Sequence, residues 1–84
     1  FGKTIKHNYE LLNNLQEFKL LGFPVLIGAS RKSMIYNLLD SSPQEALNGT
    51  SVINSMALQN GADILRVHDV KEAKECITLW KSLQ

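Results

Sequence analysis

Residues 24–33 read PVLIGASRKS, an apolar run that stops at a glycine and passes directly into two serines and two cations. Val25, Leu26 and Ile27 are consecutive, and they lack the apolar–polar alternation of a half-buried strand. A continuous run of this kind is typical of a strand buried on both faces, as in a parallel sheet. We therefore expect a strand over residues 25–28, with the serines and cations beyond its carboxyl end.

Helical patterns lie on both sides of this strand. Upstream, over residues 5–21, apolar residues recur at helical spacings, which predicts one helix with a single apolar stripe: Leu11, Leu12, Leu15, Phe18 and Leu21. Gly22 is expected to end this helix, and Pro24 prevents its continuation. Downstream, Ser30 is expected to cap a short helix that carries Met34, Ile35, Leu38 and Leu39.

A longer helix is predicted to start at Ser42-Pro43-Gln44-Glu45, which has a serine, a proline and a glutamate at the positions of a capping box. It should run to Asn60, with a possible break near Gly49, and its buried face is expected to comprise Val52, Ile53, Met56 and Ala57.

A second strand is expected over residues 63–68, followed by a last helix that Asp69 and Glu72 open as a cap pair. Ala73, Ile77 and Trp80 should point inward from that helix. Strands that alternate with helices indicate βα units and a parallel sheet. Two parallel strands cannot cover both of their faces, so we expect a larger α/β protein, either a doubly wound sheet or a barrel.

Composition excludes several classes of function. The 84 residues carry a net charge of +1, so no overall field favours nucleic acid or a membrane surface. No apolar stretch reaches the length of a membrane span. The single cysteine, Cys76, is expected to be a half-buried apolar residue, which agrees with a cytoplasmic location.

Charged residues mark the carboxyl ends of both predicted strands, where parallel α/β proteins bind their ligands. Arg31 and Lys32 follow the first strand, while Arg66 and His68 should share one face of the second. Together these four side chains would line one anion-binding cleft. The alternative is a capped helix with solvated cations, together with an arginine in a salt bridge and an ordinary core histidine.

Several motifs at matching separations make the chain similar to the C-terminal third of dihydropteroate synthase. They are Phe1-Gly2-Lys3, His7-Asn8, residues 24–28, Ser30-Arg31-Lys32-Ser33, Leu47-Asn48-Gly49-Thr50, Gly61-Ala62-Asp63 and residues 66–70. The resemblance implies a (β/α)8 TIM barrel, of which this chain would supply helix 6, strand 7, helix 7, strand 8 and helix 8. Residues 1–84 would then be the C-terminal part of a single pterin-binding barrel domain, not a complete domain.

The resemblance also implies a reaction in folate biosynthesis. 4-Aminobenzoate would attack 6-hydroxymethyl-7,8-dihydropterin diphosphate, giving 7,8-dihydropteroate and pyrophosphate. Mg²⁺ would assist the leaving group through ligands upstream of this segment, and sulfonamides would compete with the aminobenzoate. A homodimer is expected for the full-length protein, and the isolated 84-residue chain is expected to be inactive.

Functional roles follow from the same resemblance. Lys32, Arg66 and His68 are the expected catalytic residues: Lys32 and Arg66 would contact the pterin, and Arg66 and His68 the diphosphate. Ser30 would receive the carboxylate of the aminobenzoate. Phe1 would pack on its ring, and Gly28 would line the pterin pocket. By the same comparison Arg31 would be structural, and no residue of this segment would bind metal.

Three other readings stay open. A related pterin-binding methyltransferase would share the barrel and the pterin pocket, but it would not depend on aminobenzoate. A catalytically inactive barrel, kept as a scaffold or ligand sensor, would retain the fold without turnover. A plain anion-binding or nucleic-acid-binding module is disfavoured by the near-neutral charge.

Overall fold

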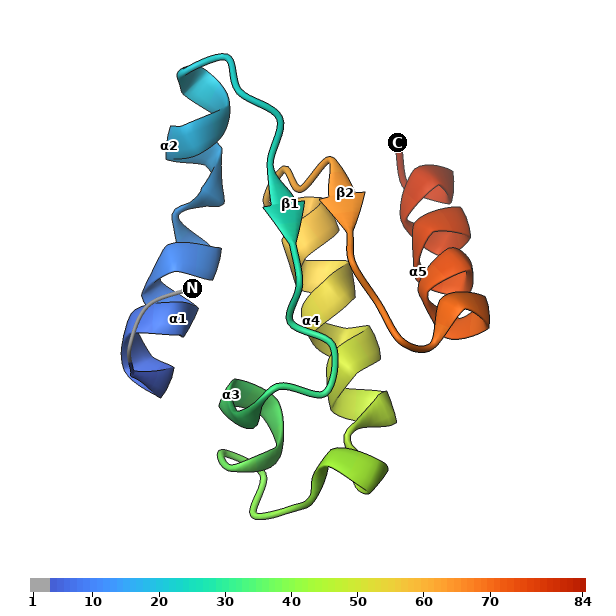
Figure 1. Ribbon diagram of the computed structural model, residues 1–84. Coiled ribbons are helices and arrows are strands. Elements are labelled where there is room, and N and C mark those ends of the chain that lie inside the picture. Colours follow the sequence, from blue (N-terminus) through green and yellow to red (C-terminus); the bar gives the residue numbers. More distant parts are fainter. Residues whose placement is uncertain (1–3) are drawn as a thin grey trace.

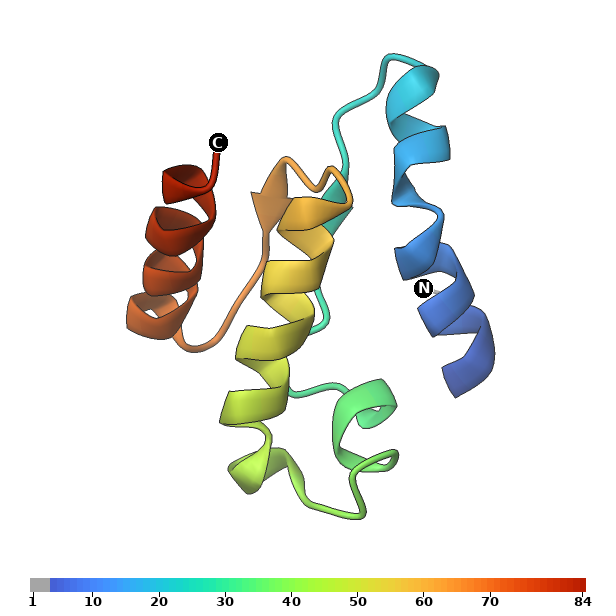
Figure 2. The same cartoon turned by 180° about the vertical axis from the view of Figure 1, so that it is seen from behind.

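The computed structural model describes residues 4–84, with two short strands at the centre and helices around them (Figure 1). The elements, in chain order, are α1 (Ile5–Asn13), α2 (Leu15–Leu20), β1 (Leu26–Ile27), α3 (Ser33–Tyr36), the 3₁₀ turn η1 (Pro43–Glu45), α4 (Leu47–Gln59), β2 (Ile64–Leu65) and α5 (Val70–Ser82). Figure 2 shows α4 lying across one face of the strand pair, with α1 and α2 on one side and α5 on the other.

The two strands are parallel, as the alternation of helices and strands predicts. Leu26 pairs with Ile64 and Ile27 with Leu65. Both strands are shorter than expected from the sequence. The backbone bond from Arg66 N–H to Ile27 O, at 2.8 Å, extends the pairing slightly beyond β2. Within residues 4–84 each strand has one neighbour, so only one edge of each can form a ladder.

The two faces of this small sheet differ in burial. Ile27 is 4% exposed and belongs to the core, whereas Leu26 is 55% exposed and its register partner Ile64 is 52% exposed. Residues 4–84 therefore cover one face of the first strand, and burial of its second face stays a prediction for a larger protein. One apolar face is covered and the other is open.

The N-terminal helical segment is broken where the sequence predicts one continuous helix. α1 and α2 meet at Asn14, which has φ −106° and ψ 20° and so leaves the helical region. Leu12 and Leu15, on either side of the break, are both buried. Gly22 has φ +84°, which confirms that this glycine ends the segment in a left-handed conformation.

The segment after β1 has less helix than expected. α3 spans four residues, Leu38 and Leu39 are exposed, and Asp40 has φ +53°. The capping-box sequence folds as η1, and the Ser42 side chain makes no capping bond there. Ser42 does occupy the N-cap position of η1, so a helical turn starts where the sequence predicts one. This turn is a separate 3₁₀ turn, and α4 begins later, at Leu47.

α4 is continuous through Gly49 but presents a different face from the predicted one. Its buried residues are Gly49, Thr50, Ile53, Asn54, Ala57 and Leu58. Ile53 and Ala57 are thus confirmed as core, whereas Val52 and Met56 are exposed. The apolar sequence pattern is nearly uniform around this helix, so periodicity alone could not orient it.

α5 follows the second strand and packs against α4. Ala73 is buried and Ile77 and Trp80 are half-buried, in agreement with the expected inward face. Asp69 occupies the N-cap position, but its side chain makes no capping bond. Within residues 4–84, no helix combines the length and apolar character needed to cross a membrane.

Candidate active site

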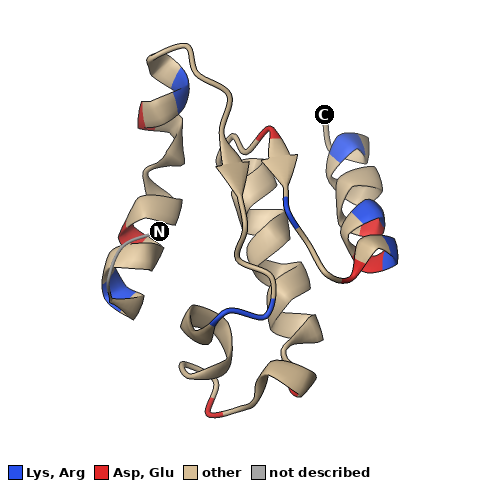
Figure 3. Cartoon of the chain, viewed as in Figure 1, with Lys and Arg blue, Asp and Glu red and all other residues tan. Residues whose placement is uncertain are grey.

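A cavity of about 300 Å³ lies at the carboxyl ends of β1 and β2, and six residues line it: Gly28, Ser30, Lys32, Arg66, Val67 and His68. Figure 3 shows the basic residues at the exits of both strands. The prediction that the two strand exits form one cleft is confirmed for Lys32, Arg66 and His68. It is wrong for Arg31, whose side chain is engaged elsewhere.

The strand register continues past the sheet and aligns the two exits. Leu26 and Ile64 are paired partners, and Ser30 and His68 stand at the same separation of 38 residues. The backbone N–H of His68 donates to Ser30 Oγ at 3.2 Å, and His68 Nδ1 lies 3.0 Å from the same oxygen. Parallel pairing thus brings together a hydroxyl and an imidazole that are 38 residues apart in the chain.

Ser30 is 3% exposed, and its side chain belongs to this contact, not to a helix cap. The expectation that Ser30 caps the next helix is wrong: Lys32 is the N-cap residue of α3, without a side-chain bond. Two hydrogen arrangements satisfy the Ser30–His68 contact. Either the hydroxyl donates to Nδ1, or a protonated Nδ1 donates to the hydroxyl oxygen. Only the second leaves the hydroxyl proton available for a ligand.

Gly28 leaves room for the close approach of Arg66. A Cβ atom built on Gly28 would lie 2.9 Å from Arg66 Nε and 3.0 Å from its Nη2. Gly28 therefore lets the guanidinium lie directly against the β1 backbone. Among residues 4–84 the structure places no carboxylate in a salt bridge with Arg66, so the salt-bridged reading of this arginine finds no support there.

Arg31 is not among the residues that line the cavity, and its side chain binds Asp69. Its Nε and Nη2 atoms donate to Asp69 Oδ2 and Oδ1 at 2.9 and 3.0 Å. The hydrogen bond from Arg31, more than its charge, lowers the pKa of the Asp69 carboxyl from its ordinary value of 3.8, and the same bond raises the pKa of Arg31. This geometry agrees with a structural role for Arg31.

Asp69 occupies the expected N-cap position of α5, but its carboxylate binds Arg31 instead of capping the helix, which the sequence did not predict. The sequence places it in a cap pair with Glu72, because an acidic residue before a helix is typical of an N-cap. The separation of 38 residues that joins Ser30 to His68 also joins Arg31 to Asp69. Extending the strand register by one step past the Ser30–His68 contact would have revealed the pair.

The chemistry of the cavity lining favours an anion. Lys32 and Arg66 supply positive charge, Ser30 and His68 supply polar groups, and no carboxylate is among the lining residues. These donors do not fit Mg²⁺, which prefers carboxylate and carbonyl oxygens. Residues 4–84 contain no cluster of three His, Cys, Asp or Glu side chains that could hold a metal ion. Phe1 lies outside the described residues.

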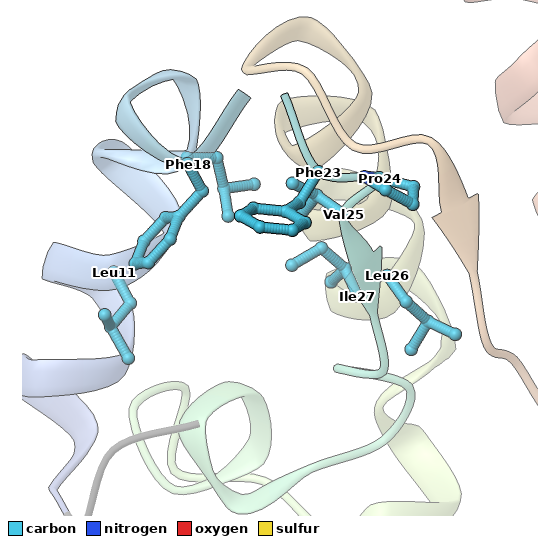
Figure 4. A pocket seen from close by; sticks show the side chains of 8 residues that line it. Leu11, Phe18, Phe23, Pro24, Val25, Leu26 and Ile27 are labelled. Atoms are coloured by element: carbon cyan, nitrogen blue, oxygen red, sulfur yellow. The ribbon is translucent and has the colours of Figure 1, made fainter. Parts of the chain in front are cut away.

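A second hollow, of about 330 Å³, is apolar and lies away from this site. Side chains from α1 and α2 face those of residues 23–27 across it, as Figure 4 shows for Leu11, Phe18 and Phe23. Val25 and Ile27 also contribute to its lining. Its lining residues carry no ionisable group, so this hollow is suited to packing another apolar element, not to chemistry.

Comparison with known proteins places this chain in a family. The family described as "Pterin binding enzyme" matches residues 1–68. The dihydropteroate synthase of Haemophilus influenzae is 46% identical over 82 residues, covering 98% of this chain and 30% of that protein. The Escherichia coli dihydropteroate synthase is 49% identical over 77 residues, covering 92% of this chain and 27% of that protein. The chain thus spans about 30% of the length of these relatives.

Solved structures agree with this result. The 7,8-dihydropteroate synthase of Vibrio fischeri superposes with a TM-score of 0.94 at 42% identity, covering 99% of this chain and 31% of the other. The Coxiella burnetii dihydropteroate synthase, solved in complex with pteroic acid, superposes with a TM-score of 0.92 at 43% identity. The match covers 98% of this chain and 30% of the other. The fold is therefore that of a portion of these TIM-barrel enzymes. On this evidence the chain belongs to the pterin-binding enzyme family.

Proposed function

We propose that the chain is the C-terminal part of a dihydropteroate synthase. The observation that carries this proposal is the shared cavity, in which Ser30, Lys32, Arg66 and His68 converge from two adjacent strand exits. A hydroxyl, two cations and an imidazole suit substrates that carry a diphosphate at one end and an aryl carboxylate at the other. The similarity to dihydropteroate synthases covers nearly the whole chain.

The proposed reaction is a displacement at carbon. The amino nitrogen of 4-aminobenzoate forms a bond to the methylene carbon of 6-hydroxymethyl-7,8-dihydropterin diphosphate. The bond from that carbon to the diphosphate oxygen breaks, and pyrophosphate leaves with the electron pair. The nitrogen then loses a proton, which gives 7,8-dihydropteroate. Because negative charge grows on the leaving group, fixed cations beside it lower the barrier.

The catalytic residues of this proposal are Lys32, Arg66 and His68. Arg66 packs along Gly28 and presents a planar fork of donors to the cavity, which suits diphosphate oxygens. His68 Nδ1 is held by Ser30, so the ring is oriented and its Nε2 atom can donate to a phosphate oxygen. Lys32 contacts the pterin and flanks the aminobenzoate.

Ser30, Gly28 and Phe1 complete the substrate-binding set. Ser30 would bind the aminobenzoate carboxylate when its hydroxyl proton is free of His68. Gly28 lines the pterin pocket, and Phe1 would pack against the aminobenzoate ring. Mg²⁺ remains an expected cofactor, but the cavity lining does not fit it, and no step assigned to these residues depends on it.

The finer assignment within the barrel is also part of the proposal. α1 and α2 would form helix 6, β1 strand 7, α3 to α4 the loop and helix 7, β2 strand 8, and α5 helix 8. The open face of Leu26 and Ile64 would then point into the barrel. The apolar hollow between α2 and β1 would receive the preceding strand. Each apolar surface that the chain leaves open thus has an expected occupant.

The full-length protein is further proposed to be a cytoplasmic homodimer that uses the outer helices. An apolar groove of about 860 Å³ lies between α4 and α5. Val52, Met56, Leu79 and Leu83 line it and are exposed, and Trp80 is half-buried beside them. A large apolar groove of this kind favours an interface between subunits.

The reading as a pterin-binding methyltransferase fits the cavity less well. Transfer of a methyl group does not release a diphosphate, so it does not require two cations and a histidine around one small cavity. A catalytically inactive barrel would not require these side chains either.

Pyrophosphate release tests the proposal in the full-length protein that contains this chain. Unmodified protein and the Lys32→Ala variant are compared with dihydropterin diphosphate as substrate, with and without 4-aminobenzoate. We expect release that depends on aminobenzoate, and a loss of at least tenfold in kcat/KM in the variant, because one charged contact contributes roughly that factor.

Lys81→Ala provides the matched control, because Lys81 is an exposed lysine in the last turn of α5, outside the cavity. This variant should keep the unmodified rate. Folded protein that binds pterin but releases no pyrophosphate would overturn the proposed function. Release without aminobenzoate would point to a different acceptor.

A further inference from the structure

Arg31 joins three segments of the chain, two of which carry the residues that line the cavity. Its own segment follows β1. Its Nη1 atom donates to the carbonyl oxygens of Pro43 and Gln44 in η1, at 2.7 and 3.1 Å. Its remaining donors reach the carboxylate of Asp69, at the start of α5. All three guanidinium nitrogens are therefore used, each in a directed bond.

The backbone of Arg31 is held as firmly as its side chain. Its φ of +52° is a left-handed conformation that a residue with a Cβ atom seldom adopts. Its N–H donates to Thr50 Oγ1 at 3.0 Å, and the Thr50 hydroxyl in turn donates to Ala46 O at 2.6 Å. Thr50 is buried in α4. Persistent strain of this kind requires that the surrounding contacts fix the conformation.

The residues that this arrangement fixes are the immediate neighbours of the cavity side chains. Ser30 and Lys32 flank Arg31, and His68 precedes Asp69 in the chain. Each half of the Ser30–His68 contact is thus one residue away from one half of the Arg31–Asp69 pair. We propose that Arg31 and Asp69 are positioning residues, which set the distance between Ser30 and His68 and the direction of Lys32.

The physical basis of this role is geometric. A two-bond contact between a guanidinium and a carboxylate fixes both separation and orientation, which a single bond does not. If the pair loosens, the Ser30–His68 contact loses the neighbouring two-bond contact that fixes the separation of the strand exits beyond it. A misplacement of about 1 Å in a catalytic site can lower the rate on the order of 100-fold.

The chain contains an internal control for this proposal, because the structure places a second salt bridge near the opposite end of the same sheet. Lys19 Nζ lies 2.6 Å from Asp63 Oδ1, and Asp63 Oδ2 accepts the Val25 N–H at 2.7 Å. Asp63 directly precedes β2, whereas Asp69 follows it. Asp63 therefore ties an element to the sheet as Asp69 does, but away from the cavity.

The test compares Asp69→Asn with Asp63→Asn in the full-length protein, and it rests on the proposed synthase activity for one of its two readouts. Both substitutions preserve shape and remove one charge. We expect Asp69→Asn to lower kcat/KM, per folded enzyme, by about 10- to 100-fold. Asp63→Asn should lower the melting temperature about as much as Asp69→Asn does. It should change kcat/KM by less than about twofold.

The second readout does not depend on turnover. The ¹⁵N chemical shifts of the His68 ring report its tautomer and its contact with Ser30. They should change in Asp69→Asn and stay unchanged in Asp63→Asn. Arg31→Lys, which keeps the charge but not the fork of donors, should resemble Asp69→Asn in both readouts.

Each outcome has one meaning. Equal kcat/KM and unchanged His68 shifts in the two aspartate variants would overturn the positioning role, even with an active unmodified enzyme. An inactive unmodified protein would overturn the proposed function, and the His68 shifts would then decide the positioning role alone. If Asp69→Asn does not fold, Asp69→Glu, which keeps the charge and displaces the carboxylate, replaces it in the same comparison.

Discussion

At the scale of single residues, the site depends on one hydroxyl with two tasks. Ser30 accepts the backbone N–H of His68 and also shares a hydrogen with its ring. If the ring is protonated at Nδ1, the Ser30 proton is free to bind a carboxylate. In the proposed enzyme, the position of the hydrogen in the Ser30–His68 contact would therefore couple the diphosphate end of the cavity to its carboxylate end.

Substitution of Ser30 by alanine tests this dual role. Ser30→Ala removes both contacts to His68 together with the proposed carboxylate donor. We expect the KM for 4-aminobenzoate to rise by roughly 10- to 100-fold, because hydrogen bonds to charged groups contribute about 1.5–3 kcal/mol. The KM for dihydropterin diphosphate should rise as well, since His68 loses its orientation. Steady-state kinetics with each substrate varied in turn measure both values.

Ser33→Ala is the matched control, because Ser33 is exposed at the start of α3 and is not among the cavity residues. Its two KM values should equal those of the unmodified enzyme. A Ser30→Ala variant with altered KM for aminobenzoate alone would disprove the coupling to His68.

Three of the cavity residues could be predicted from the sequence. The sequence predicts that Lys32, Arg66 and His68 share one cleft, because parallel strands present their carboxyl ends at one edge of the sheet. The sequence predicts capping side chains at Ser30 and Asp69, and neither side chain makes a capping bond. Local patterns favour caps for such residues, but here a contact 38 residues away competes for each side chain. Such a contact depends on strand register, which no local pattern contains.

At the scale of elements, Gly49 shows why the predicted break in α4 is absent from the structure. A glycine within a helical pattern suggests a break, since glycine costs about 1 kcal/mol relative to alanine. The structure has no break there. A Cβ atom on Gly49 would lie 2.5 Å from Ile35 Cγ2 and 3.1 Å from Leu39 Cδ1. The glycine therefore allows α3 to pack directly on α4, and it serves contact between elements instead of a turn.

Gly49→Ala is accordingly expected to destabilise the protein. The gain in helix propensity is about 1 kcal/mol, but overpacking against the β-branched Ile35 typically costs 1–3 kcal/mol. We expect the free energy of unfolding to fall by up to about 2 kcal/mol, the difference between these two effects, measured by urea denaturation of the full-length protein. Asn48→Ala, at an exposed position one residue earlier in α4, should be neutral within about 0.5 kcal/mol. A stabilised Gly49→Ala variant would show that α3 yields without cost.

At the scale of the whole molecule, the surfaces of this chain predict what must cover them. Element order and the parallel sheet followed from the sequence, and so did the inference that two strands need a larger protein. The sequence could not say which face stays open, because Val25, Leu26 and Ile27 are all apolar. The structure distinguishes them: Ile27 is covered by the chain itself, whereas Leu26 is not.

The effect of Leu26→Asn should therefore depend on context. In the isolated 84-residue chain, which we expect to be inactive, this change removes exposed apolar surface and should raise the soluble fraction. In the full-length protein the same amide would be buried inside the barrel without partners, and stability should fall by about 2–5 kcal/mol. Ile27→Asn is the control, since Ile27 is buried in the chain itself and its substitution should be harmful in both contexts. Sedimentation assays on the isolated chain and thermal melts of the full-length protein provide the comparison.

If Leu26→Asn is tolerated in the full-length protein, the open face does not form the interior of a barrel. Turnover by the isolated chain would show that the proposed barrel is not needed for catalysis.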